Sequence, residues 1–146
     1  MADLSALRRR HAELIFMCRA ARERWGQQAV DALAECHMKA IREAFARKAA
    51  ELGSNDLAAF VGQMTTHPET HTREEVRSDE GVYEMKITRC AHAEIFAEWN
   101  ARDIGLQFVC GGDVAMIEGF NPAMQLRRPK LLMRGDDCCR LIYTME

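Results

Sequence analysis

The hydrophobic positions of the first 64 residues recur at helical spacing. Over residues 3–25 the apolar side chains fall on one helical face, with charged residues between them, at Leu4, Leu7, Leu14, Cys18, Ala21 and Trp25. A second amphipathic helix is expected over residues 27–52, and a short third helix over residues 57–64. Because only Gly26 separates the two long helices, the pattern predicts an antiparallel helical hairpin.

The pattern changes to a strand-like alternation after Gly81. Tyr83, Met85 and Ile87 alternate with polar residues, which predicts a half-buried strand. Residues 65–81 are polar and contain Pro68, which indicates a loop, and residues 91–101 are expected to form a short helix. Short apolar segments punctuated by Gly, Asn and Pro are expected to be further strands, at residues 106–110, 114–117, 124–126, 130–133 and 141–143.

This order of elements predicts an α+β fold, in which an N-terminal helical hairpin packs on a C-terminal, mostly antiparallel sheet with one short helix. A length of 146 residues is typical of one domain. We therefore expect a single domain over residues 1–146, with a helical part at 1–64 and a sheet part at 82–146.

Composition and charge narrow the classes of partner and location. The formal net charge of −2, with one short basic run at residues 8–10, argues against nucleic-acid binding. No apolar run approaches the roughly 20 residues that span a bilayer, and the first residues do not have the pattern of a signal peptide. We expect a cytoplasmic protein without a membrane partner, in which the six cysteines are free thiols or metal ligands.

The sheet half contains thiols and carboxylates at element ends. Cys90 lies where a strand is expected to pass into a helix, a position that favours either a thiolate or a small buried side chain. Asp113 follows two glycines and precedes an apolar segment, so it is either a paired, metal-bound or exposed carboxylate or a turn residue. Glu118, before Gly119, is a second candidate carboxylate, although ordinary turn solvation is favoured for it.

The remaining cysteines and the histidines allow further groupings. Cys138 and Cys139 point to opposite faces of a strand, so only one of them faces a given site, and the sequence allows a set of Cys90, Asp113 and Cys139 to meet in space without a Cys-x-x-Cys zinc signature. His11 and His37 lie among the apolar positions of the long helices, either as packed side chains or as acid–base groups over the sheet. His92 is a candidate ligand or surface residue. The pair His67 and His71 has helical metal-ligand spacing, which Pro68 argues against.

Three ordered motifs resemble one family. They are Thr88-Arg-Cys-Ala-His-Ala-Glu-Ile-Phe96, then Cys110-Gly-Gly-Asp-Val-Ala-Met-Ile-Glu-Gly-Phe-Asn-Pro122, then Leu126-Arg-Arg with Gly135-Asp-Asp-Cys-Cys139. Over roughly residues 82–143 the chain resembles the L-2-amino-thiazoline-4-carboxylic acid hydrolase-like family, and its last motif is also similar to vinyl-reductase-like domains. The resemblance implies opening of a thiazoline ring to an N-carbamoyl-cysteine. The resemblance also implies Cys90, Asp113 and Cys139 as site residues, with Glu94 and Asn121 as secondary candidates.

These observations predict a small hydrolase that opens a cyclic amidine, amide or lactone. The expected catalytic residues are Cys90, Asp113, Glu94 and His37, and the expected substrate-binding residues are Asn121 and Glu118. In one mechanism the Cys90 thiolate attacks the ring carbon. In the other, a divalent metal, zinc by ligand type, is held by Cys90, Asp113, Cys139 and His92 and activates water. The alternative function is a non-catalytic small-molecule or metal-binding sensory module, and the N-terminal helices are a candidate homo-oligomer interface.

Overall fold

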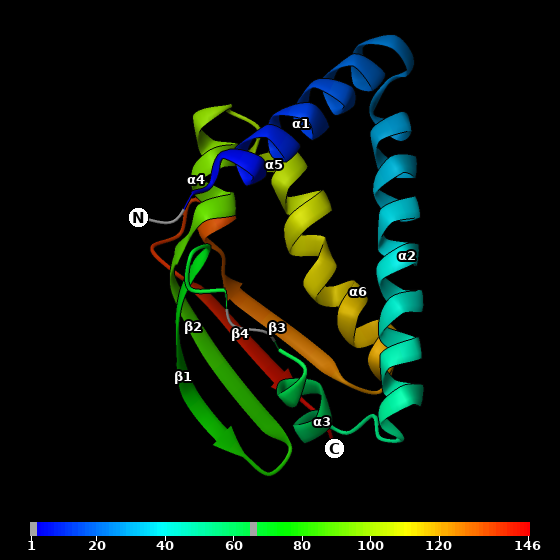
Figure 1. Ribbon diagram of the computed structural model, residues 1–146, viewed down its shortest axis with the longest axis vertical. Coiled ribbons are helices and arrows are strands. Elements are labelled where there is room, and N and C mark those ends of the chain that lie inside the picture. The colour runs from blue at the N-terminus through cyan, green and yellow to red at the C-terminus, as the bar shows by residue number, and fades with distance from the viewer. Residues whose placement is uncertain (1–2, 65–66) are drawn as a thin grey trace.

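A computed structural model, which describes residues 3–64 and 67–146, confirms the α+β fold class (Figure 1). Helices come first, and the second half contains a four-stranded antiparallel sheet with the strand order β1-β2-β4-β3. The helices are α1 (Ser5–Trp25), α2 (Gln27–Leu52), α3 (Leu57–Gly62), α4 (Ala91–Glu98), α5 (Arg102–Gly105) and α6 (Gly111–Phe120). The strands are β1 (His71–Asp79), β2 (Val82–Cys90), β3 (Gln125–Lys130) and β4 (Cys139–Thr144).

The two long helices form as their apolar spacing predicts, and they meet at Gly26. The backbone of Gly26 has a φ of 85°, a left-handed value that glycine adopts without a steric cost. Figure 1 shows α1 and α2 diverging from this point: α1 crosses over α4 and α5, whereas α2 runs alongside α6. The hairpin is therefore open, and its two arms cover different parts of the second half of the chain.

The largest correction to the sequence interpretation concerns residues 106–117. Both segments predicted there as strands, 106–110 and 114–117, are helical: η1 (Leu106–Cys110) is a π-helical turn that joins α5 to α6. A short apolar run does not distinguish a strand from a buried helix, and the glycines at 111 and 112 suggested a turn. These glycines instead lie in the helical segment that faces Met38 and Ile41 of α2, so the second half contains more than the one expected short helix.

Two further segments differ from expectation. Residues 71–79, within the predicted loop 65–81, form β1 at the sheet edge, with register irregularities next to Thr72 and Glu75. Its side chains are mostly exposed on both faces, so the strand has no hydrophobic alternation to reveal it. The predicted strand at residues 130–133 ends at Lys130 and continues as a 3-10 turn, η2 (Leu132–Arg134). Residues 65 and 66 lie outside the described part of the chain.

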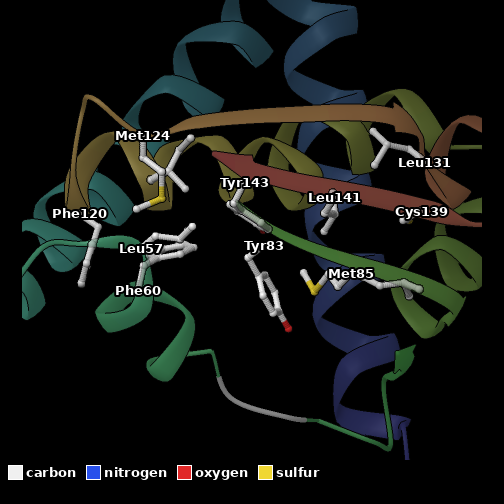
Figure 2. Close-up of a cluster of buried hydrophobic side chains, with 12 residues drawn as sticks. Leu57, Phe60, Tyr83, Met85, Phe120, Met124, Leu131, Cys139, Leu141 and Tyr143 are labelled. Carbon is white, nitrogen blue, oxygen red and sulfur yellow. The ribbon is translucent and has the colours of Figure 1, made fainter. Parts of the chain in front are cut away.

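The apolar core has two clusters. One lies between the sheet, α3 and α6, where Phe60 contacts the rings of Phe120 and Tyr143 at centroid distances of 5.3 and 5.4 Å (Figure 2). The other joins α1, α2 and α4 around Ile15, Cys18 and Phe96. Since Cys90, Leu106 and Cys110 contact both clusters, the junction of β2, α4 and η1 connects the two halves of the fold.

Substitution of Gly119 by alanine is expected to destabilise the protein by about 3 kcal/mol, because a Cβ there would lie 2.1 Å from the main-chain oxygen of Arg42 in α2. Gly112→Ala is the matched control on the same helix, since its nearest neighbour would be the flexible Ile41 side chain at 3.5 Å. Urea unfolding of both variants measures the difference. Equal free energies of unfolding of Gly119→Ala and Gly112→Ala would show that α2 and α6 move apart at Gly119 with little loss of stability.

Within residues 3–64 and 67–146, no helix is both long enough and apolar enough to span a membrane. Helix α1 exposes Phe16, Met17 and, at its end, Trp25, and Met17 also lines the cavity described below. The homo-oligomer interface expected at the N-terminal helices stays a prediction, which a sedimentation measurement of the oligomeric state tests.

Candidate active site

The helices and the sheet enclose a cavity of about 790 Å³. Its walls come from α1, α2, α3, η1 and the first turns of α4 and α6, together with β1, β2 and β4. The apolar part of the wall includes Met85, Leu141 and Tyr143, which point from the sheet in Figure 2. A pocket of this size and largely apolar character, with a few convergent polar groups, is typical of a small-molecule site.

Three thiols and one carboxylate converge on this cavity. Cys90 ends β2 and caps α4, Cys110 ends η1, Cys139 begins β4, and Asp113 lies in the first turn of α6. They lie close enough to influence one another's ionisation, since Asp113 raises the pKa of all three thiols. The fold therefore brings together the Cys90, Asp113 and Cys139 side chains that the sequence placed at element ends.

Asp113 is a carboxylate in a poorly hydrated place. Burial raises the pKa of Asp113 to about 6, and the Arg128 guanidinium, 3.9 Å from its Oδ2, acts in the opposite direction. Asp113 is a residue of the cavity wall, and 31% of its side chain remains exposed. Arg128 in turn donates a hydrogen bond to the carbonyl oxygen of Cys110 at 2.5 Å, so one side chain connects the carboxylate to the π-helical turn. A carboxylate with a pKa near neutrality is suited to proton transfer.

The pKa of Cys90 is not depressed, in contrast to the thiolate interpretation of its position at a helix N-terminus. Burial raises the pKa of Cys90, although hydrogen bonds from the main-chain N–H groups of Ala93 and His92 favour its thiolate. Burial raises the pKa of Cys110 to about 12 and that of Cys139 to about 11. The α4 N-terminus thus supplies two donors to Cys90 but does not by itself make it a thiolate, so a thiol reaction here requires a base.

All five histidines of the chain line the same cavity: His11, His37, His67, His71 and His92. Nε2 of His11 and Nδ1 of His92 share a hydrogen bond of 2.8 Å, and the ring of His71 lies 5.3 Å from that of His92. Burial lowers the pKa of both His11 and His92 to about 4, so these two imidazoles are neutral at pH 7. His37 is exposed on α2, with its ring 6.1 Å from that of Phe108.

Three residues expected at the site lie outside the cavity wall. Glu94 is exposed and forms an ion pair with Arg89 at 3.0 Å. Glu118 pairs with Arg42 of α2 at 3.5 Å. Asn121 is buried and holds the turn after α6, since its Nδ2 donates to the Asn55 carbonyl oxygen and its Oδ1 accepts from Ala123 N–H, both at 2.9 Å. These contacts give Glu94, Glu118 and Asn121 structural roles outside the cavity.

The expected metal ligands Cys90, Asp113, Cys139 and His92 all line the cavity. Within the described residues, however, no three His, Cys, Asp or Glu side chains are grouped so that they could hold a metal ion. The donor set for zinc is therefore not assembled in this arrangement, and elemental analysis is the test of the metal-dependent alternative.

Sequence reasoning missed Cys110, Arg128 and His71 as residues of this region. Cys110 and Arg128 lie within the motifs that carry the family resemblance, but neither was among the residues expected at the site. His71 was discounted together with His67 because a helical pair was the pattern sought, yet β1 places it beside His92. The positions of the histidines are the sequence feature that points to this region, because all five histidines of the chain line one cavity.

The fold and the site define an α+β protein with a cavity of small-molecule size that presents thiols and a perturbed carboxylate. The family model of L-2-amino-thiazoline-4-carboxylic acid hydrolase matches residues 8–143, nearly the whole chain. The chain therefore belongs to this family, whose name denotes a hydrolase. A search of curated proteins found no match.

Proposed function

We propose that the protein is a hydrolase that opens the ring of a 2-amino-thiazoline-4-carboxylate or a closely related cyclic amidine in the cavity. The observation that supports this most strongly is the convergence of Cys90 and Asp113 on one largely apolar cavity, in a chain of this family. The reactive carbon of such a ring is bonded to sulfur and nitrogen, so it is an electrophile that a thiol can attack.

In the first step, Asp113 accepts the proton of the Cys90 thiol as the sulfur attacks the ring carbon. The bond from this carbon to the ring sulfur breaks, and the ring sulfur leaves with the electron pair and takes the proton from Asp113. The substrate is then joined to Cys90 as an open-chain isothiourea. The main-chain N–H groups of His92 and Ala93 stabilise negative charge on the Cys90 sulfur as it develops and as it leaves.

In the second step, water attacks the same carbon while Asp113 accepts a proton from it. The bond to the Cys90 sulfur breaks and Asp113 returns its proton to this sulfur, while the second proton of the water moves to the amidine nitrogen as the carbonyl group forms. The product is an N-carbamoyl-cysteine with a free thiol. In both steps Asp113 is ionised before the attack and protonated when the sulfur leaves. A pKa of about 6 allows Asp113 to accept and return a proton in this way at neutral pH.

Incubation of the purified protein with L-2-amino-thiazoline-4-carboxylate tests this proposal. The expected result is chromatographically detected N-carbamoyl-cysteine, formed in proportion to protein concentration. Metal analysis and a free-thiol count on the same preparation separate the mechanisms. Stoichiometric zinc with masked cavity thiols would contradict the thiol mechanism in favour of metal-bound water, and binding of the ring without product would favour the sensory-module alternative.

The rate of hydrolysis is expected to depend on pH through Asp113. Because the base is active when ionised, kcat/KM is expected to rise about tenfold per pH unit below pH 6 and to level off above it. Removal of the Arg128 charge by Arg128→Gln is expected to move this midpoint to higher pH, since that guanidinium lowers the pKa of Asp113. The exposed Arg127→Gln, the neighbouring position on β3, is the control and should leave the midpoint in place.

A midpoint that stays the same in Arg128→Gln would show that a group other than Asp113 controls this part of the pH profile. The comparison uses a midpoint rather than a rate, so it is insensitive to the stability that Arg128→Gln loses with the hydrogen bond to the Cys110 carbonyl oxygen.

A further inference from the structure

Basic side chains gather at one end of the cavity, which is lined by α1, α4 and the start of β1. We call it the basic end, and it consists of Arg10 and His11 of α1, His71 and Arg73 of β1, and His92 of α4. The acidic residues of the cavity wall within the described chain are Glu13, which is exposed on α1, and Asp113 of α6.

Three imidazoles form the inner part of this end. His11 is only 4% exposed, its Nε2 shares a hydrogen bond with Nδ1 of His92, and its ring also packs on Phe96 at 4.7 Å. The ring of His71 lies on the other side of His92, and Nδ1 of His71 shares a 2.9 Å hydrogen bond with the Thr70 hydroxyl. The histidines are thus held in place by one another and by the fold rather than by solvent.

One buried polar atom at this end has no hydrogen-bond partner among the described residues. This atom is Nδ1 of His11, although almost all of the side chain is buried. An unsatisfied buried atom of this kind costs about 1–3 kcal/mol, and natural structures normally provide a partner for it.

The basic end lies next to the proposed reaction centre. Cys90 caps α4, and His92 lies in the first turn of the same helix, two residues later. A ring whose reactive carbon lies over Cys90 therefore has its substituents within the part of the cavity that His92, His11 and His71 line. A carboxylate substituent accepts hydrogen bonds from imidazole N–H groups and is attracted by the Arg10 and Arg73 guanidinium groups.

We infer that the basic end is the binding subsite for the carboxylate group of the ring ligand, with His92 and His71 as hydrogen-bonding residues, His11 as the residue that holds the His92 ring, and Arg10 and Arg73 as the flanking charges. This inference deepens the proposed function and rests on it for the choice of a ring ligand. It assigns specificity for a carboxylated ring to residues of three different elements, separate from the Cys90 and Asp113 pair that carries out the reaction.

The test uses two rings that lack the carbon attacked in the proposed reaction, so that binding is measured apart from turnover. L-Thiazolidine-4-carboxylate carries the carboxylate and thiazolidine does not, and neither has an amidine carbon. Isothermal titration calorimetry on the wild-type protein is expected to give at least about tenfold tighter binding of the carboxylate, the effect of one charge-assisted hydrogen bond. His92→Gln is expected to reduce this ratio to near one, and His71→Gln to reduce it partly.

Lys48→Gln is the control for a general effect of positive charge in the cavity. Lys48 also lines the cavity but lies near the C-terminal end of α2, over the ring of Phe45 at 4.6 Å. Its removal is expected to leave the ratio unchanged. Circular dichroism spectra of the three variants verify folding, and His71→Gln, in a partly exposed strand position, keeps the test available if His92→Gln does not fold.

Equal binding of the two rings to the wild-type protein, absence of binding, or an unchanged ratio in the histidine variants would overturn the inference. A reduced ratio in Lys48→Gln alone would overturn it as well. The proposed function is read separately, from hydrolysis of L-2-amino-thiazoline-4-carboxylate by the wild-type protein. A protein that fails to hydrolyse this ring but retains the histidine-dependent ratio contradicts the proposed function and supports the basic end as an anion subsite.

Discussion

Replacement of Cys90 by alanine is expected to lower kcat for ring opening on the order of 10³-fold or more, while the protein stays folded. The side chain supplies the nucleophile in the proposed reaction, and removal of a nucleophile leaves only the contributions of binding and of the surrounding dipoles. The loss should fall on kcat rather than on KM, because the sulfur forms its bond with the substrate during the chemical step. Steady-state kinetics with L-2-amino-thiazoline-4-carboxylate measure both constants.

Cys138→Ala is the matched control for this substitution. Cys138 is also a buried thiol, next in sequence to a cavity residue, but it is not part of the cavity wall. Its replacement makes the same chemical change in the core and is expected to leave kcat within a fewfold of the wild-type value. If Cys90→Ala and Cys138→Ala had the same kcat, Asp113 would have to activate water directly and the covalent step would be wrong.

Asp113→Asn is expected to have two opposite effects, a loss of activity and a gain of stability. Removal of a general base lowers kcat by about 10²- to 10⁴-fold. The carboxyl group has a folded-state pKa of about 6 against an ordinary value of 3.8, so its contribution to stability is full below pH 3.8 and is lost as the pH rises through 6. At pH 7.5 the neutral amide should therefore raise the free energy of unfolding by up to about 3 kcal/mol.

Urea unfolding of wild type and Asp113→Asn at pH 7.5 and pH 4 checks the stability effect. The gain should be present at pH 7.5 and absent at pH 4, where the wild-type carboxyl group is protonated. Asp137→Asn is the control with the opposite sign: a hydrogen bond from Lys130, at 2.8 Å, lowers the pKa of this exposed carboxyl group, so its replacement should give no gain at pH 7.5. A destabilised Asp113→Asn at pH 7.5 would mean that the carboxylate is well solvated or paired in the folded protein.

The sequence predicted those elements whose burial follows a regular period. Residues 5–52 bury one face of two helices, and β2 alternates apolar and polar residues with Tyr83, Met85 and Ile87 buried, so both were predictable from spacing alone. The helical path from Arg102 to Phe120 was not, because Phe108, Ile117 and their apolar neighbours are buried from several sides and the glycines imitate turns. The edge strand β1 was hidden for the opposite reason, since hydrogen bonding to β2, not burial, holds it in place.

The candidate site also has features that the sequence predicted and features that it did not. Cys90 and Asp113 were found because a reactive side chain at an element end is visible in the sequence, although Asp113 begins a helix and not a strand. The direction of the Cys90 pKa was not visible, since it depends on how deeply the fold buries the sulfur. The contact between His11 and His92 joins residues 81 positions apart, and only the crossing of α1 over α4 creates it.

The most direct test of Cys90 as the nucleophile is mass spectrometry of the protein after rapid acid quenching with L-2-amino-thiazoline-4-carboxylate. The account predicts a transient increase equal to the mass of one substrate molecule, located on the peptide that contains Cys90 and absent in Cys90→Ala. Because attack opens the ring without loss of atoms, the adduct has the full mass of the substrate. Turnover by the wild-type protein with no adduct at any quench time, together with full activity of Cys90→Ala, would contradict it.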